Sequence, residues 1–245
     1  MKQKTRKQLK WTGIIFVSLV ILVLIVGAIF LNQATYQAMD EAQYLGDDKT
    51  VIKVDSGYLI EPDEVKANFV FYQGGLVETE SYLPFVKALS EQGIRVFLPE
   101  FPLNLAILNT DQFQTLYDEY PSDLPWWIGG HSLGGASAAI FLSEDPQNIA
   151  GLLLLGAYPS DSSDLSEANV SVISMHAEND EIMNKEAYER TQSLLPEDTH
   201  FVEIEGGNHS QFGHYGFQTG DGVSTISREQ QQAEVIATLV NALSN

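Results

Sequence analysis

Apolar and polar residues divide this chain into two unlike parts. From Gly13 to Leu31 the sequence is almost entirely apolar and carries no charge, whereas from Thr50 onward short apolar runs alternate with amphipathic segments. The 19 residues of the first run, at roughly 1.5 Å of rise each, make about 28 Å of helix, close to the thickness of a bilayer's hydrocarbon core. The pattern predicts a membrane-spanning helix followed by a folded domain.

The domain is predicted to alternate strands and helices. Runs rich in β-branched and aromatic residues, bounded by turn residues, predict strands, and apolar positions at helical spacing predict helices. The expected strands are 51–54, 58–60, 68–72, 94–98, 126–128, 149–155, 170–175 and 200–204, and the expected helices are 81–92, 111–120, 133–143, 186–195 and 228–243. This order predicts an α/β fold, with a mostly parallel sheet covered by helices on both faces. Active groups of such sheets gather in the loops beyond the carboxyl ends of the strands.

Charge divides the chain at the same place as hydropathy. Five basic residues precede the apolar run, and no acidic residue occurs before Asp40. Basic residues resist translocation, so we expect 1–12 to be a cytoplasmic tail, 13–31 a signal anchor and the rest to lie outside the cytoplasm. Residues 32–49 are expected to form a stalk or a first helix, and 50–245 the domain.

The alternative for the N-terminal segment is a cleaved signal peptide, which would leave a secreted protein. The apolar region of such a peptide usually has about 7–15 residues, fewer than this run, and ends at a small-x-small site. No convincing site of that kind follows Leu31. An anchor in the lipid bilayer is therefore favoured over secretion.

Composition removes several kinds of function. The chain has no cysteine, which excludes a disulfide framework, a thiolate nucleophile and a cysteine-bound zinc. After residue 31 it has eight basic against 33 acidic residues, a charge that repels nucleic acid and anionic lipid. We expect no nucleic-acid partner.

One motif predicts a nucleophile. Gly130-His131-Ser132-Leu133-Gly134 matches G-x-S-x-G, lies after an expected strand and opens an expected helix of small residues. A serine on such a tight, strained turn is exposed at the tip of its strand, and the helix N-terminus favours developing negative charge. Side chains at Gly130 and Gly134 would collide with neighbouring backbone. We therefore expect Ser132 to be a catalytic nucleophile, with His131 pointing away from the working face.

A base and an acid follow in later loops. His209 lies in a glycine-rich loop after the last expected strand, where its imidazole can activate a serine at the same sheet edge. Asp180 ends the turn after the strand 170–175 and is expected to orient that imidazole. His214 is the rival base and Glu178 the rival acid. The order Ser132, Asp180, His209 is that of α/β-hydrolases.

The oxyanion of an acyl transfer needs two backbone N–H donors. Leu133, directly after the nucleophile, is expected to supply one. The loop after the strand 68–72 is expected to supply the other, from Gly75 or alternatively Leu76.

The chain resembles the α/β-hydrolase superfamily, within its small dienelactone-hydrolase-like group. Five stretches spread over residues 66–245 carry the resemblance: 71–77, 101–106, 129–135, 177–180 and 206–213. The resemblance implies that Ser132, Asp180 and His209 form a triad and that the reaction is hydrolysis of a small ester-like substrate. Dienelactone hydrolases proper use a cysteine nucleophile, which this chain lacks, so their substrate is not carried over.

Two further expectations concern what surrounds the site. Only about 14 residues, 156–169, follow the strand 149–155, too few for a sizeable lid, so loops such as 101–108 and 211–218 are expected to roof an open site. No cofactor or metal is expected, because the spacing of His209 and His214 fits no common ligand pattern. The alternative functions are an acyltransferase on the same scaffold and an anchored binding module with an inactive site.

Overall fold

The computed structural model describes residues 2–46, 48 and 50–243, with the side chains of 2–10, 28 and 32 left undescribed. It divides into two compact units, 1–35 and 36–245. The first unit is one helix, α1 (Lys2–Ala34). Its segment Trp11–Leu31 has a mean hydropathy of 3.4, and none of it is buried. This helix is long and apolar enough to be a candidate membrane span.

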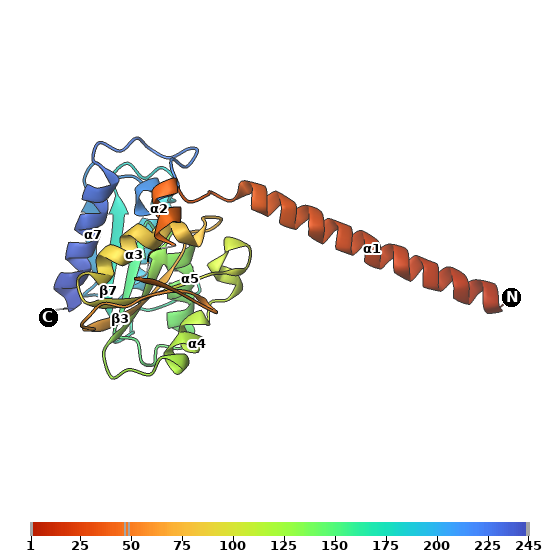
Figure 1. Ribbon diagram of the computed structural model, residues 1–245, viewed down its shortest axis with the longest axis horizontal. Helices are drawn as coiled ribbons and strands as arrows, with labels where there is room; N and C mark the ends of the chain where they lie inside the picture. Colours follow the sequence, from red (N-terminus) through yellow and green to blue (C-terminus); the bar gives the residue numbers. More distant parts are fainter. Residues whose placement is uncertain (1, 47, 49, 244–245) are drawn as a thin grey trace. The chain divides into compact units, whose positions relative to one another are not determined.

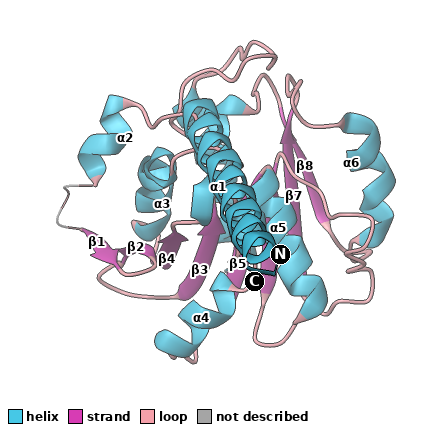
Figure 2. Ribbon diagram, turned by 90° about the vertical axis from the view of Figure 1, so that its right-hand side faces the viewer, coloured by secondary structure: helices cyan, strands magenta, loops and turns pink. Residues whose placement is uncertain are grey.

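The second unit is built on one eight-stranded sheet. The strand order is β1, β2, β4, β3, β5, β6, β7, β8. Figure 2 labels each of these strands except β6. The two outermost strands on one side, β1 and β2, are antiparallel to their neighbours, and the strands from β4 to β8 run parallel. Their bounds are Val51–Val54, Gly57–Ile60, Ala67–Tyr72 (β3), Ile94–Pro99 (β4), Trp126–His131 (β5), Gly151–Leu155 (β6), Ser171–Ala177 (β7) and His200–Ile204 (β8).

Helices cover both faces of the sheet (Figure 1). On one face α3 (Leu83–Ser90) and α7 (Arg228–Leu243) pack on a core that includes Phe71 and Met175. On the other, α4 (Gln112–Glu119) and α5 (Leu133–Glu144) pack on a core that includes Val70 and Leu154. Alternate residues of a strand point to opposite faces, so strands buried on both sides are almost continuously apolar. The fold is the predicted α/β-hydrolase fold.

Two shorter helices and five 3₁₀ turns complete the unit. The helices are α2 (Asp40–Leu45) and α6 (Lys185–Thr191), and the turns are Thr79–Tyr82, Pro102–Asn104, Ala106–Leu108, Gln192–Leu194 and Ser210–Phe212. Residues 156–170 contain turns and bends but no helix, so β6 is followed by no sizeable lid.

The structure differs from the predicted elements mainly at their ends. β5 continues through Gly129, Gly130 and His131, because these residues pair with β6 although glycine has low strand propensity. The helix expected from Ser81 begins as a 3₁₀ turn and becomes α-helical at Leu83, next to Pro84. The folded unit begins at Tyr36 instead of Thr50, because Tyr36 pairs with Val77.

Candidate active site

Ser132 is a single strained residue between β5 and α5. Its φ of 52° and ψ of −123° lie outside the regions that L residues ordinarily adopt. Its N–H donates to the Leu155 carbonyl at 2.9 Å, and its carbonyl accepts from Ala136 at 3.1 Å. The side chain is half-buried and stands at the carboxyl edge of the sheet. Within the described part of the chain its hydroxyl makes no hydrogen bond.

The glycines of the motif allow the elbow to pack against β3. A Cβ added at Gly130 or at Gly134 would overlap the Tyr72 carbonyl oxygen at the end of that strand. Real Cβ atoms do not approach a carbonyl so closely, so either substitution forces the backbone to move. This is the collision that the motif predicts.

His209 and Asp180 form a buried pair beside the elbow. The Nδ1 atom of His209 lies 2.7 Å from Oδ2 of Asp180, and the two side chains are 1% and 0% exposed. The other carboxylate oxygen accepts the N–H groups of Ile182 and Met183 at 2.9 and 2.8 Å. A carboxylate oxygen only accepts hydrogen bonds, so Nδ1 donates in this contact, and in the neutral imidazole Nε2 is then the acceptor nitrogen.

Gly156 brings this pair next to Ser132. It directly follows Leu155, whose carbonyl binds the Ser132 N–H. A Cβ at Gly156 would lie 3.0 Å from His209 Nδ1 and 3.1 Å from Asp180 Oδ2. Because its φ is +51°, the position also disfavours any side chain for backbone reasons. The end of β6 therefore touches both the elbow and the histidine–aspartate pair.

The rival base and acid have other partners. His214 places Nδ1 3.0 Å from Glu41 and Nε2 3.2 Å from Gln232, so both ring nitrogens are occupied in a contact between α2 and α7. Glu178 accepts the Gly206 N–H at 2.8 Å. These contacts favour His209 and Asp180 over both alternatives.

The loop after β3 lies against the start of α5. A Cβ at Gly75 would come within 2.9 Å of the Leu133 side chain, so the two residues are neighbours. Leu76 donates its N–H to the Asn104 carbonyl at 2.8 Å, and this bond disfavours it as an oxyanion donor. Neither Gly75 nor Leu133 uses its N–H within the described residues. The pair Leu133 and Gly75 remains the better candidate.

His131 lies closer to the working groups than its place in the motif predicted. The expectation that it points away was wrong in one respect: its ring is buried, and its centroid is 4.4 Å from that of His209. Its Nδ1 is 2.9 Å from the Tyr82 hydroxyl, which accepts the Gly74 N–H at 3.0 Å. Burial, followed by the nearby His209, lowers the pKa of His131 well below its usual value. The His131 ring therefore links the loop after β3, through Tyr82, to His209.

Asp221 is a second buried acid that sequence reasoning missed. It accepts the backbone N–H and the hydroxyl of Ser210 at 2.8 and 2.5 Å. It also accepts the N–H groups of His209 and Glu181, each at 3.4 Å. One carboxylate thus fixes the histidine loop and the loop that carries Asp180. Only its flanking glycines, Gly220 and Gly222, marked it in the sequence.

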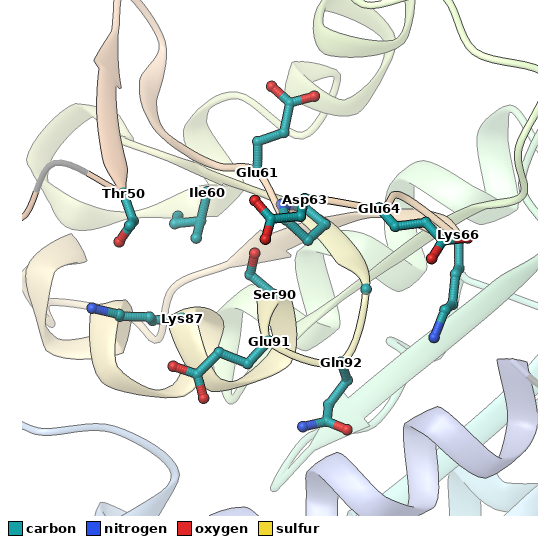
Figure 3. Close-up of a pocket in the computed structure, with 12 residues that line it drawn as sticks. Thr50, Ile60, Glu61, Asp63, Glu64, Lys66, Lys87, Ser90, Glu91 and Gln92 are labelled. Carbon is teal, nitrogen blue, oxygen red and sulfur yellow. The ribbon is translucent and has the colours of Figure 1, made fainter.

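A separate hollow lies at the opposite edge of the sheet (Figure 3). It has a volume of about 530 Å³ and lies beside Lys66, just before β3, and Gly93, just before β4. Charged side chains of both signs line it, among them Asp63 and Lys87. Lys87 is paired with Asp48 at 2.5 Å, so it is not free to bind an anion. This hollow belongs to the solvated surface.

Comparison with known proteins agrees with this architecture. The model of the family described as "Alpha/beta hydrolase family" matches residues 68–233. The chain therefore belongs to the alpha/beta hydrolase family. No curated protein matches its sequence.

Solved structures share the fold at low sequence identity. A monoacylglycerol lipase from Paleococcus ferrophilus has a TM-score of 0.60 and 13% identity, over 75% of this chain and 98% of its own. The acyl-protein thioesterase 2 of Zea mays has a TM-score of 0.57 and 14% identity, over 76% of this chain and 97% of its own. A dienelactone hydrolase from Anabaena variabilis has a TM-score of 0.53 and 15% identity, over 75% of this chain and 88% of its own. At these identities the likeness shows the fold.

The neutral state of His131 predicts how stability depends on pH. An unfolded His131 takes up a proton below pH about 6.5, whereas the folded one stays neutral, so the folded state is weakened as pH falls through that value. The loss is roughly 1 kcal/mol for each pH unit below 6.5. Denaturant unfolding of the wild type and of His131→Asn between pH 7.5 and 5 measures how the free energy of unfolding changes with pH. The variant, although less stable at pH 7.5, is expected to show the flatter pH dependence, and equal slopes would contradict the assignment.

Proposed function

We propose that this chain is a serine hydrolase that cleaves ester-like bonds through an acyl-enzyme on Ser132. The observation that carries the proposal is the buried contact of 2.7 Å between His209 and Asp180, beside Ser132, whose hydroxyl makes no hydrogen bond among the described residues. Membership of a hydrolase family supports it, as do structural neighbours named as a lipase, a thioesterase and a dienelactone hydrolase.

In the first half-reaction Nε2 of His209 takes the hydroxyl proton of Ser132 while Oγ attacks the substrate carbonyl carbon. The carbonyl π bond opens and leaves a negative oxygen between the N–H groups of Leu133 and Gly75. Asp180 holds the imidazole in the required tautomer and stabilises the imidazolium. When the carbonyl re-forms, the alcohol leaves with the proton from Nε2, and the acyl group stays on Ser132.

In the second half-reaction water takes the place of the alcohol. Nε2 removes a proton from the water, whose oxygen attacks the acyl carbon, and the same two N–H donors stabilise the second tetrahedral intermediate. Its collapse returns the proton to Ser132 and releases the acid. The short connection after β6 leaves the serine half-exposed, so water has direct access to the acyl-enzyme.

We also propose that Trp11–Leu31 anchors the enzyme in a membrane, with the N-terminus in the cytoplasm and the folded unit outside. The basic residues before the span and the lack of acids there support this orientation. No residue proposed for the chemistry precedes Gly75, so the anchor holds the enzyme in place without entering the reaction.

Replacing the nucleophile tests the proposed reaction. We expect Ser132→Ala to lower kcat for a short-chain ester on the order of 10³-fold or more, and to abolish labelling by a fluorophosphonate probe. Circular dichroism checks that the variant stays folded. Ser143→Ala, on the same helix but away from the elbow, is the matched control. It should keep both the ester turnover and the probe labelling of the wild type. Turnover like that of the wild type in Ser132→Ala would end the proposal.

A pair of acid variants tests which carboxylate orients the base. Asp180→Asn can no longer hold the imidazole in the required tautomer, and we expect kcat to fall by roughly 10²–10⁴-fold. Glu178→Gln, two residues earlier in the same turn, should change kcat little, because Glu178 contacts the Gly206 N–H and not the imidazole. If the two variants behave in the opposite way, the acid is Glu178.

Protease treatment of intact cells tests the topology. An external protease is expected to digest the folded unit and to leave the short basic tail protected. Immunoblots with tags at each end measure the two fragments, and cells opened by detergent serve as the control. Digestion of the folded unit only after lysis would reverse the orientation.

A further inference from the structure

The folded unit joins the anchor at the edge of the sheet that carries Ser132. Tyr36 donates its N–H to the Leu76 carbonyl at 2.7 Å and accepts the Glu78 N–H at 3.0 Å. Leu76 directly follows Gly75, the proposed oxyanion donor. The chain therefore enters the folded unit at the rim of the candidate active site.

Chain length limits how far Tyr36, the entry point of the folded unit, can lie from the end of the apolar segment. Five peptide steps separate Leu31, the last residue of the candidate span, from Tyr36. Fully extended, they reach at most about 18 Å. This limit follows from covalent geometry alone and holds for any angle between the helix and the folded unit.

The segment that enters the unit also contacts the histidine loop. Met39 donates its N–H to the His214 carbonyl at 2.8 Å, and the rings of Tyr36 and Tyr215 are 5.6 Å apart. On the other side, the N–H of Leu76 binds Asn104 in the loop after β4. Both the loop after β4 and the loop after β8 therefore lie next to the entry point.

These two loops carry exposed apolar side chains, which we call the apolar rim. Leu103, Ile107 and Leu108 belong to the loop after β4, and Phe217 and Val223 to the loop after β8. Phe217 is 58% and Val223 79% exposed, so more than half of each apolar residue stays in contact with water. Several such residues on neighbouring loops mark an interaction surface better than single ones do.

The loop segments that carry most of the apolar rim contain no charged residue, in a chain that is otherwise strongly acidic. No Asp, Glu, Lys or Arg occurs in 101–110 or in 206–220, and none occurs from residue 11 to residue 39. Acids of the same edge follow β6 and β7, where Asp161, Asp164 and Glu181 lie. Two acids near the entry of the chain are held by partners: Glu78 accepts the Ala38 N–H, and Glu41 contacts His214.

We propose that the apolar rim rests on the surface of the bilayer that holds Trp11–Leu31, and that the substrate is an ester whose acyl chain lies in that bilayer. The substrate assignment rests on the proposed function. Apolar side chains are favourable at the bilayer interface, whereas charged ones resist losing their water. The short connection keeps the bilayer surface within reach of the apolar rim at all times. The rim therefore meets the bilayer at a high effective concentration. A membrane-resident ester then reaches Ser132 without crossing water.

Fluorescence quenching on the full chain tests the docking without using catalysis. Because the chain has no cysteine, Phe217→Cys and Leu108→Cys each accept one label. Phe201→Cys is the matched control: Phe201 is 40% exposed and lies near the start of β8, at the opposite edge of the sheet. The proteins are reconstituted in phosphatidylcholine vesicles, which avoid repulsion of the acidic unit.

The rim labels are expected to be quenched by a lipid-dissolved nitroxide and shielded from aqueous iodide, and the control label to show the reverse. Equal access of iodide to all three labels would overturn the proposal. Shielding that appears only at high protein-to-lipid ratios, without quenching by the nitroxide, would mean that a second copy covers the rim and would also overturn it.

Kinetics on the same vesicles test the substrate class. The measured quantity is turnover of a long-chain monoacylglycerol in the vesicle divided by turnover of a short-chain soluble ester. Inserting 20 Gly/Ser residues after Ala34 lengthens the connection about fivefold, and the effective concentration falls with roughly the 3/2 power of length, so the ratio is expected to drop on the order of 10-fold. Phe217→Ser should lower the ratio as well, and Phe201→Ser should leave it unchanged.

These outcomes separate the two proposals. If the wild type hydrolyses neither ester, the proposed function fails, and the quenching result still decides the docking. If the soluble ester is hydrolysed but the ratio is the same in all variants, the substrate class proposed here is wrong and the hydrolase assignment stands.

Discussion

The site depends on the close contact between the nucleophile elbow and the end of β3. A residue at Ser132's φ of 52° stores strain on the order of 1–3 kcal/mol, which persists only where the surrounding structure fixes it. Here Gly130 and Gly134 let the elbow touch the Tyr72 carbonyl, and the buried strands on both sides hold it there. The same contact sets the loop of Gly75 against the first residue of α5. This one packing contact thus positions both the proposed nucleophile and the proposed oxyanion donors.

Around the base, negative charge is balanced by dipoles and not by cations. Asp180 and Asp221 are both buried, and their described hydrogen-bond partners are backbone amides, the Ser210 hydroxyl and the His209 ring. Fixed amides do not titrate, and His131 is held neutral by burial. The described surroundings of His209 thus hold no cation that would compete with its imidazole for Asp180, as the proposed role of a base requires.

The sequence predicted the parts of this protein that depend on local pattern. Buried strands such as Gly151–Leu155 and the terminal helix Arg228–Leu243 follow from apolar periodicity, and Ser132 follows from glycines at fixed spacing. Tyr82 and Asp221 were missed because their roles come from partners 49 and 11 residues away, His131 and Ser210, which no local pattern brings together. Tyr36 likewise joins the folded unit through a bridge to Val77, across 40 residues of chain, and no local pattern predicts such a bridge.

The two outer strands of the sheet have a consequence for a protein that is anchored in a membrane, as proposed above. Each has one side without a neighbouring strand of the sheet, to which a strand of another molecule can add. β1 carries Lys53, which is paired with Glu100, and β8 carries His200 and the exposed Glu203. Charges on an edge strand discourage such additions. In the proposed anchored state, these charges would oppose growth of the sheet from one copy into the next.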